Sequence, residues 1–328
     1  MSGAPLPTLS VVVPNYNHGR FLEHTLPALA GQSFQPLELL VLDDASTDNS
    51  VEIIKRLAAQ YPIVRLVQNE RNLGVMPNLN KGIGLAHGDY VFISSADDQV
   101  QPGFLQKSLR LLAEHPEAGL SCTVCQWRYA ATGVSWYMGV GMADRAAYLS
   151  PEELVRVGRR GKLAISSSSV IFRRGPLLEA GRFIPELRWH SDWFAAYIIG
   201  LRYGLCFVPE PLSLVNILPK SFYTAGVRGP EHRQVLLRIV ELLLTPPFAD
   251  VLPRVRDSGA LSLFAMPMLK LLVSRREFRH FINWQFLRWT LWRSAELIGR
   301  DILPRSLAQW VLKRFYALNQ TASPAQPP

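Results

Sequence analysis

Short apolar runs alternate with segments of helical spacing along the first part of the chain. The runs Leu9–Pro14, Leu37–Leu42 and Val64–Val67 are rich in Val and Leu, which is typical of buried strands. Between them, Phe21–Ala30 and Ser50–Gln60 place apolar residues at the spacing of a helix face. This order predicts βαβ units, so we expect an α/β fold with a Rossmann-like, mostly parallel sheet and helices on both faces.

Acidic residues gather where the predicted strands end. Asp43 and Asp44 follow the second run, and Asp97 and Asp98 follow a further run, Tyr90–Ile93. Ligands of such sheets bind beyond the carboxyl ends of the strands, so these acids are candidates for a binding site. Turns and helix caps are the alternative interpretation of both pairs, although a cap does not explain two adjacent acids at positions 43 and 44.

Composition excludes several classes of protein. With 48% hydrophobic residues among 328, the chain is too apolar to be intrinsically disordered. Its three cysteines, Cys122, Cys125 and Cys206, have no framework spacing, so we expect buried thiols rather than disulfides. The first residues do not resemble a signal peptide, and no uncharged apolar stretch has the length of a membrane span. These features predict a cytoplasmic protein.

The positive charge is concentrated in the last third. The formal net charge is +9, and the chain from Val227 onward holds 15 Lys and Arg against 7 Asp and Glu, which leaves the front nearly neutral. This change in composition predicts a nearly neutral front domain over residues 1–225, a basic, Trp-rich helical extension over 226–320 and a disordered tail over 321–328.

Several short motifs lie along the front domain: Val11–Asn17, Gln32–Phe34, Val41–Asp48, Asn72–Val75, Gly88–Tyr90 and Ser95–Asp98. In this order and spacing they resemble family 2 of the glycosyltransferases, which have the GT-A fold. The resemblance covers roughly residues 9–215 and leaves the basic tail outside.

The resemblance implies a nucleotide-diphospho-sugar donor, with a UDP-sugar expected. Pro14 and Tyr16 would line the base pocket, and Asp44 would accept a hydrogen bond from the base. The donor-binding residues that it implies are Pro14, Asn15, Tyr16, Asp43, Asp44, Asn80 and Asp97.

The resemblance also implies a metal site at Asp97 and Asp98, which fall on an Asp-x-Asp-like motif. Carboxylate oxygens suit Mg²⁺ or Mn²⁺, and such an ion neutralises a leaving diphosphate. Two positions depart from the family pattern. Ser95 stands where many relatives have a first Asp, and Leu79 stands where relatives often carry an arginine.

Asp192 is the residue that the resemblance assigns as general base. It lies within Trp189–Trp193 and would take the proton of the acceptor hydroxyl. The structural alternative is an N-cap or first-turn acid of a helix over Trp193–Leu201, and both roles are compatible. His190 is a second acid/base candidate. Because Val215 and Asn216 replace a common arginine or histidine, Lys220 is a candidate replacement for a diphosphate contact.

The segment between residues 127 and 162 is the least constrained by the family pattern. It contains Trp136–Gly141, which is predicted to be a flexible aromatic loop, and Ser150 before Pro151, which predicts a capped helix start. Aromatic faces beside glycines suit sugar or lipid acceptors, and filling of the core is the alternative.

The basic extension alternates apolar and cationic residues and is predicted to form an amphipathic helix that binds a membrane interface. Packing of this helix on the catalytic domain is one alternative. Nucleic-acid binding is another, although no nucleic-acid motif accompanies the charge. The predicted apolar face comprises Phe278, Phe281, Ile282, Trp289 and Trp292, and the polar face comprises Arg279, Asn283, Thr290 and Arg293.

These inferences converge on an inverting, hexosyltransferase-like enzyme at the cytoplasmic face of a membrane. It would move a sugar to a glycan or lipid-linked acceptor in cell-surface polysaccharide or glycolipid synthesis. Inversion is expected because a single candidate base is visible. The alternatives are a nucleotidyltransferase, for which we find no Gly-rich phosphate loop, and a non-catalytic membrane- or nucleic-acid-binding module on the same fold.

Overall fold

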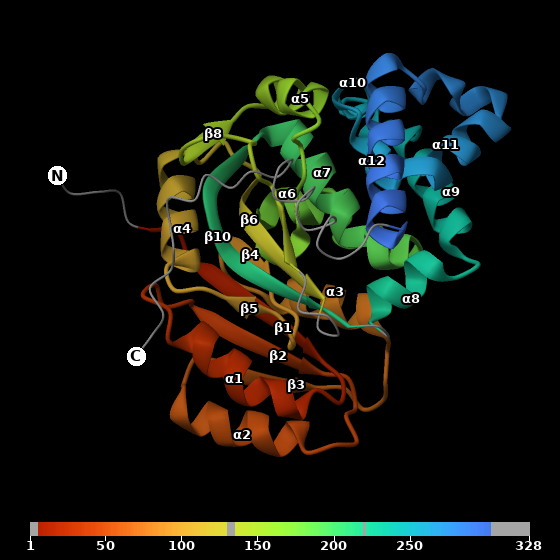
Figure 1. Ribbon diagram of the computed structural model, residues 1–328. Helices are drawn as coiled ribbons and strands as arrows, with labels where there is room; N and C mark the ends of the chain where they lie inside the picture. The colour runs from red at the N-terminus through yellow and green to blue at the C-terminus, as the bar shows by residue number, and fades with distance from the viewer. Residues whose placement is uncertain (1–5, 130–134, 219–220, 303–328) are drawn as a thin grey trace.

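A computed structural model describes residues 6–129, 135–218 and 221–302. The described residues form one ten-stranded sheet in the order β3-β2-β1-β4-β9-β6-β10-β5, with β7 paired to β6 and β8 paired to β10 (Figure 1). The strands are β1 Leu9–Asn15, β2 Glu38–Asp43, β3 Val64–Gln68, β4 Tyr90–Ile93, β5 Gln99–Val100, β6 Leu120–Tyr129, β7 Ser135–Met138, β8 Ala147–Leu149, β9 Val170–Arg173 and β10 Leu205–Ile217.

Most of the sheet runs in one direction. β1, β2, β3, β4, β6 and β10 point the same way, whereas β5, β7, β8 and β9 are antiparallel to their neighbours. The predicted α/β fold is therefore confirmed.

The helices are α1 Gly19–Ala30, α2 Ser50–Gln60, α3 Val75–Leu85, α4 Phe104–Glu114, α5 Pro151–Arg159, α6 Arg174–Glu179, α7 Ser191–Tyr203, α8 Phe222–Arg228, α9 His232–Leu243, α10 Leu252–Ser258, α11 Ala265–Ser274 and α12 Trp284–Ile302. Five 3₁₀ turns complete the described fold: η1 Ser167–Ser169, η2 Pro185–His190, η3 Pro246–Phe248, η4 Ala260–Phe264 and η5 Arg276–Phe281.

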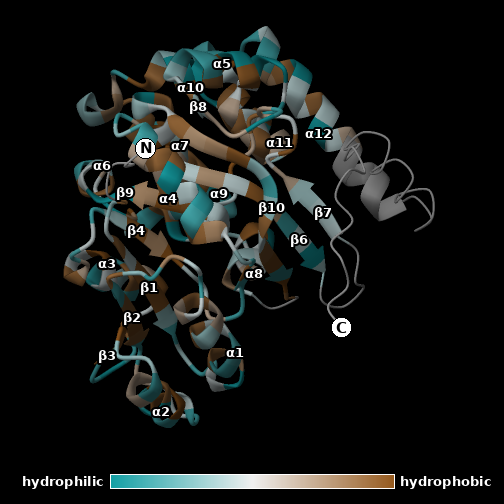
Figure 2. Ribbon diagram, turned by 90° about the vertical axis from the view of Figure 1, so that its left-hand side faces the viewer, coloured by the Kyte–Doolittle hydropathy of each residue, from teal (hydrophilic) through white to brown (hydrophobic). Residues whose placement is uncertain are grey.

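Each face of the sheet has its own hydrophobic core because side chains alternate along a strand. Val11 and Val13 of β1 point to the core formed with α1, α2 and α4. Val12 points to the opposite core, which includes α3, α5, α7 and the C-terminal helices. In Figure 2 the central strands are mostly brown, whereas the surrounding helices mix teal and brown residues, as expected of helices with one buried face.

Two predictions of local structure need correction. The strand predicted over Leu163–Phe172 is shorter, because β9 begins at Val170 and the serines before it form η1. The predicted flexible loop at Trp136 is largely the strand β7, in which Trp136 pairs with Trp127 of β6. The predicted start of α5 is confirmed, since Ser150 and Glu153 form a reciprocal capping box. The three cysteines are free and buried, as predicted.

The C-terminal helices pack against the catalytic region rather than standing apart from it. Leu154 and Val157 of α5 belong to the same core cluster as Leu261, Phe281 and Phe286. The predicted boundary at residue 225 stays a prediction, but side chains on its two sides share one core. The predicted tail over 321–328 lies outside the described residues.

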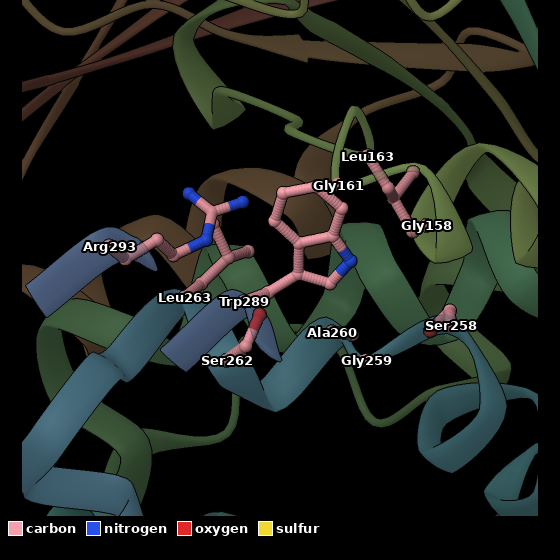
Figure 3. A pocket seen from close by; sticks show the side chains of 10 residues that line it. All are labelled: Gly158, Gly161, Leu163, Ser258, Gly259, Ala260, Ser262, Leu263, Trp289 and Arg293. Atoms are coloured by element: carbon pink, nitrogen blue, oxygen red, sulfur yellow. The ribbon is translucent and has the colours of Figure 1, made fainter. Parts of the chain in front are cut away.

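The single amphipathic helix predicted for the extension is wrong. The helix is interrupted between η5 and α12, so the residues of α12 do not continue the helical periodicity of η5. Phe278 and Phe281 are buried in the core, and Thr290, a residue of the predicted polar face, is fully buried. The indole of Trp289 lies over Gly161, where an added Cβ would be 2.5 Å from the ring (Figure 3).

Close packing between α5 and α10 makes Gly158 sensitive to substitution. A Cβ at this position would overlap the backbone carbonyl of Ser258, which cannot move aside as a side chain can. We expect Gly158→Ala to lower the free energy of unfolding by about 1–3 kcal/mol, as overpacking does. Gly175→Ala is the matched control, because no atom of the described residues lies within 4 Å of its added Cβ. Urea denaturation measures both, and equal midpoints for the two variants would contradict the expectation.

Candidate active site

The carboxyl ends of β1 and β2 hold a rigid polar frame. The Asn15 amide nitrogen donates to Asp43 at 2.8 Å, and the second oxygen of Asp43 accepts from the backbone N–H of Ser46 at 3.1 Å. Asn15 and Asp43 are buried, whereas the ring of Tyr16 is exposed beside them and Pro14 is half-buried. The frame presents Pro14 and Tyr16 at the sheet edge where ligands of such folds bind. Their contact with a nucleotide base stays a prediction.

Asp44 orders the loop that precedes α3. One of its oxygens accepts from the Asn69 side chain and from the Leu73 backbone, both at 2.8 Å. The other accepts from the backbone N–H of Gly74 at 2.9 Å. Gly74 has a φ of +86°, a conformation that favours glycine, so this turn needs both the residue and the carboxylate. The hydrogen bond from a nucleobase to Asp44 stays a prediction.

Asn80 uses its amide within the protein. Its nitrogen donates to the carbonyl of Phe183 at 2.7 Å, and its oxygen accepts from the N–H of Phe183 at 3.1 Å. This pair of bonds fastens α3 to the segment that leads into η2. Asn80 therefore has a positioning role in this structure, and its predicted contact with the donor stays a prediction. Leu79, where relatives often carry an arginine, is buried in the core.

Asp97 and Asp98 follow β4 at the same edge of the sheet. The carboxylate of Asp98 is buried and accepts from the Ser168 hydroxyl at 2.8 Å. Burial, with the charge of Asp97 adding to it, raises the pKa of Asp98 to about 7. Asp97 is half-buried, and its backbone carbonyl accepts from the side chain of Asn216 at 3.0 Å.

Asp192 lies in the first turn of α7. One of its oxygens accepts from the Ser167 hydroxyl at 2.5 Å, and the other accepts from the backbone N–H of Trp193 at 2.6 Å. Burial raises the pKa of Asp192, although both hydrogen bonds act in the opposite direction. A carboxylate with a raised pKa is a stronger base, and a helix start holds it on a rigid element.

Two adjacent serines join these acids. Within η1, Ser167 donates to Asp192 and Ser168 donates to Asp98, so one short turn fixes the predicted base relative to the predicted metal pair. The sequence shows four consecutive serines before β9, and its pattern predicts only a strand there. Serine is common in turns and in strands, so this pattern gives no sign of their role.

His190 is unsuited to acid/base catalysis. Its ring lies 3.2 Å from that of His232, nitrogen to nitrogen, and is buried against Phe264. Burial, together with the neighbouring His232, lowers the pKa of His190 to about 3, so it stays neutral near pH 7. Lys220, the other candidate of this region, lies outside the described residues.

Asn216 has a structural role that sequence reasoning missed. Its amide oxygen accepts from the Arg128 guanidinium at 2.7 and 3.2 Å, and its nitrogen holds the backbone of Asp97. Arg128 lies opposite Asn216 in the β6–β10 register. The residue that departs from the family pattern therefore positions the acidic pair.

The acidic pair fits a divalent ion shared with a substrate. Within the described residues, no group of three or more His, Cys, Asp or Glu side chains could hold a metal ion by itself. Mg²⁺ and similar ions are commonly bound by one or two carboxylates together with substrate phosphates rather than by a complete protein cage. Burial and the charge of Asp97 raise the pKa of Asp98, and a bound cation would stabilise its charged form.

Comparison with known proteins gives sequence relatives, of which two described here are glycosyltransferases by name. An uncharacterized glycosyltransferase, YibD of Escherichia coli, is 37% identical over 128 residues, which are 39% of this chain and 37% of that protein. The putative glycosyltransferase EpsE of Bacillus subtilis is 36% identical over 110 residues, 33% of this chain and 40% of that protein. The uncharacterized protein MT1568 of Mycobacterium tuberculosis is 29% identical over 63% of this chain and 66% of its own length. The chain thus spans less than two thirds of these relatives.

Solved structures share the fold. TarS of S. aureus, residues 1–349 in complex with UDP-GlcNAc, has a TM-score of 0.60 at 20% identity and covers 84% of this chain and 82% of its own. The mannosyltransferase PcManGT of Pyrobaculum calidifontis, in complex with GDP-Man and Mn²⁺, has a TM-score of 0.53 at 20% identity, with 90% and 89% covered. These likenesses confirm the predicted GT-A fold. The family model described as glycosyl transferase family 2 matches residues 10–178, more than half of the chain, and the chain belongs to that family.

Proposed function

We propose that this protein is an inverting, metal-dependent glycosyltransferase that moves a sugar from a nucleotide diphosphate to a hydroxyl of a glycan or lipid-linked acceptor. The observation that carries the proposal is η1, whose adjacent serines hold Asp98 and Asp192 in one site. A transferase of this kind needs an electrophilic group at the donor diphosphate and a base at the acceptor hydroxyl. The acidic pair would hold a divalent ion for the first function, and Asp192 would supply the second.

The donor side rests on Asp97 and Asp98. These carboxylates would hold Mg²⁺ or Mn²⁺, which when bound neutralises charge on the departing diphosphate. Two of the similar structures were obtained with UDP-GlcNAc and with GDP-Man and Mn²⁺, which supports a nucleotide-sugar donor here, with a UDP-sugar as the first candidate. The polar frame at Asn15 and Asp43 would orient Pro14 and Tyr16 toward the nucleobase of the donor.

The acceptor side rests on Asp192. Its carboxylate oxygen takes the proton of the acceptor hydroxyl while the hydroxyl oxygen bonds to the anomeric carbon. The bond between that carbon and the phosphate oxygen breaks, and the nucleoside diphosphate leaves with the electron pair. A single displacement with one base inverts the anomeric centre. Ser167 holds the carboxylate in place for this step.

A direct assay tests the proposed function. The full chain is incubated with Mn²⁺ and UDP-glucose, UDP-galactose, UDP-GlcNAc or GDP-mannose, after thermal-shift screening of the same donors. We expect one donor to raise the melting temperature and to release nucleoside diphosphate in an EDTA-sensitive reaction. Release of pyrophosphate would instead support a nucleotidyltransferase. Failure of every donor to bind would support a non-catalytic module.

The exposed side of α12 supports peripheral membrane association at the cytoplasmic face. Trp284 is 73% exposed and Leu291 is 61% exposed, and the exposed Arg288 lies between them on the same side of the helix. Tryptophan and arginine together suit the headgroup region of an anionic bilayer. Among the described residues no single helix is long and apolar enough to cross a bilayer, and one bent pair, Leu252–Ser258 with Ala260–Ser274, meets the length and composition criteria together.

Vesicle binding should depend on this face of α12. We expect the full chain to co-sediment with vesicles that contain phosphatidylglycerol, less so at high salt, because each cationic residue at the surface contributes on the order of 1 kcal/mol. Trp284→Ser with Leu291→Ser should reduce the bound fraction several-fold, and Val273→Ser, an exposed apolar position on α11, should not. Point variants are preferable to truncation because the extension shares the core. Equal binding of all three proteins would contradict the proposal.

A further inference from the structure

An aromatic surface extends away from Asp192 along β6 and β7. We define it by Trp127, Tyr129, Trp136 and Tyr223 and refer to it as the aromatic platform. Tyr223 lies 5.9 Å from Trp127, Trp127 lies 5.7 Å from Trp136, and Trp136 lies 4.7 Å from Tyr129, ring centre to ring centre. The ends of β6 and β10 point toward α8, which carries Tyr223 (Figure 1). The β6–β7 hairpin and α8, which is distant from it in sequence, thus contribute to one row of rings.

The inner end of the platform meets the candidate active site. The indole N–H of Trp127 donates to the Ser166 hydroxyl at 3.0 Å, and the next serine, Ser167, holds Asp192. The ring of Tyr223 lies 6.2 Å from His190, two residues before Asp192. The row of rings therefore begins beside the predicted base.

Both ends of the platform are open to solvent. Tyr129 at the outer end is 39% exposed and Tyr223 at the inner end is 43% exposed, while Trp127 and Trp136 are half-buried. A role in the core alone does not account for large rings left at the surface in a contiguous row, since such patches commonly mark binding sites. The platform also adjoins the candidate active site, and a cluster of rings that only fills the core has no reason to do so.

Polar groups border the ring faces. The exposed rings of Tyr129 and Tyr223 carry hydroxyls, and the Ser166 hydroxyl adjoins the edge of the Trp127 indole. A sugar ring has apolar C–H faces and a rim of hydroxyls, so it matches aromatic faces that are bordered by hydrogen-bonding groups. An acyl or prenyl chain has no polar rim and would leave these groups without partners.

We propose that the aromatic platform is the acceptor subsite and binds sugar rings of an oligosaccharide by stacking. This rests on the proposed function, because it assigns the acceptor of that transfer to the glycan class. The row continues through successive rings from Tyr223 to Tyr129, so it contacts more than the one sugar whose hydroxyl reacts. Acceptors with several sugar rings then bind more tightly than monosaccharides.

Binding to immobilised glycans tests the proposal even though the acceptor is unidentified. The full chain, fluorescently labelled, is applied to an array of bacterial-surface oligosaccharides and monosaccharides. The platform variants are Tyr129→Ala and Trp136→Ala, with Tyr129→Phe as the variant that keeps the ring. Leu244→Ala, an exposed apolar position after α9, is the matched control. Circular dichroism and thermal melting establish that each variant is folded.

We expect wild type to bind a subset of oligosaccharides and no monosaccharide. Tyr129→Ala and Trp136→Ala should weaken this binding at least tenfold, whereas Tyr129→Phe and Leu244→Ala should stay within about threefold. For a bound glycan that is also glycosylated, Tyr129→Ala should raise KM more than it lowers kcat. Binding that survives in both alanine variants, or no glycan binding by wild type, would overturn the proposal.

Two further readouts separate the sources of failure. UDP and GDP binding by wild type, followed by thermal shift, reports the donor site alone. If nucleotide binds and glycans do not, the platform assignment fails while the proposed function stands. If no nucleotide binds, the proposed function fails first. Vesicles of phosphatidylcholine are the lipid arm, and their retention through Tyr129 and Trp136 would assign the platform to a lipid and overturn the sugar assignment.

Discussion

Asp192→Asn is expected to reduce sugar transfer by about 10²- to 10⁴-fold, the usual contribution of a general base. The amide keeps the shape of the carboxylate and can still accept from Ser167, so the fold and the start of α7 should persist. Nucleotide binding should be nearly unchanged because the base acts on the acceptor. Turnover with an acceptor measures the first effect, and calorimetric titration with UDP or GDP measures the second.

Ser167→Ala is the matched variant for this prediction. The Ser167 hydroxyl lowers the pKa of Asp192 against the effect of burial, so its removal should raise that pKa further. A base works when deprotonated, and the acid limb of the pH–rate profile should therefore move to higher pH. If Asp192→Asn loses nucleotide binding and transfer together, Asp192 is a structural acid of the helix start. An unchanged rate would also exclude it as the base.

Asp97→Asn and Asp98→Asn are each expected to reduce transfer at least a hundredfold and to weaken the response to Mn²⁺. A divalent ion held by two carboxylates and a diphosphate loses a ligand and a charge in either variant. EDTA should abolish activity of the wild type, and excess Mn²⁺ should restore it. Full activity in both variants, or in excess EDTA, would contradict the assignment of the metal pair.

The acidic pair also predicts a pH dependence of stability in the metal-free protein. The pKa of Asp98 is about 7 in the folded chain and has its ordinary value near 3.8 in the unfolded chain. The folded state therefore binds the proton more tightly. Protonation of Asp98 therefore contributes fully to the stability of the fold below about pH 4, and this contribution is lost as the pH rises to about 7. Melting temperatures in EDTA should fall over this range in wild type and fall less in Asp98→Asn.

The sequence was sufficient for the front half of the fold because its signals are local. The strand pattern at Val11–Val13 alternates between two cores, and Ser50–Gln60 is a helix with the predicted bounds. Hydrogen bonds between residues that are distant in the sequence could not be predicted. No local pattern shows that Asn80 binds the backbone of Phe183, or that Asn216 holds Asp97.

The same reasoning explains why the extension departs from its predicted form. The periodic sequence Phe278–Trp292 predicts one apolar helix face. It does not predict that the helix is interrupted after Phe281, which turns the following residues to other sides. The candidate acids at positions 43, 44, 97 and 98 could be found because they follow predicted strands, and Asp192 could be found through the family resemblance. The serines that connect them could not, since serine is common in turns and strands alike.

The division of the sheet into two cores has a consequence for the order of folding during synthesis. Among the described residues, the core around α1, α2 and α4 contains none beyond Leu212, whereas the opposite core needs Phe286. Domains fold from the N-terminus as the chain emerges at about 5–20 residues per second. One face of the sheet can therefore close several seconds before the other. During that interval the apolar sides of α5 and α7 are uncovered, and a nascent chain that stalls there would expose them to chaperones and to aggregation.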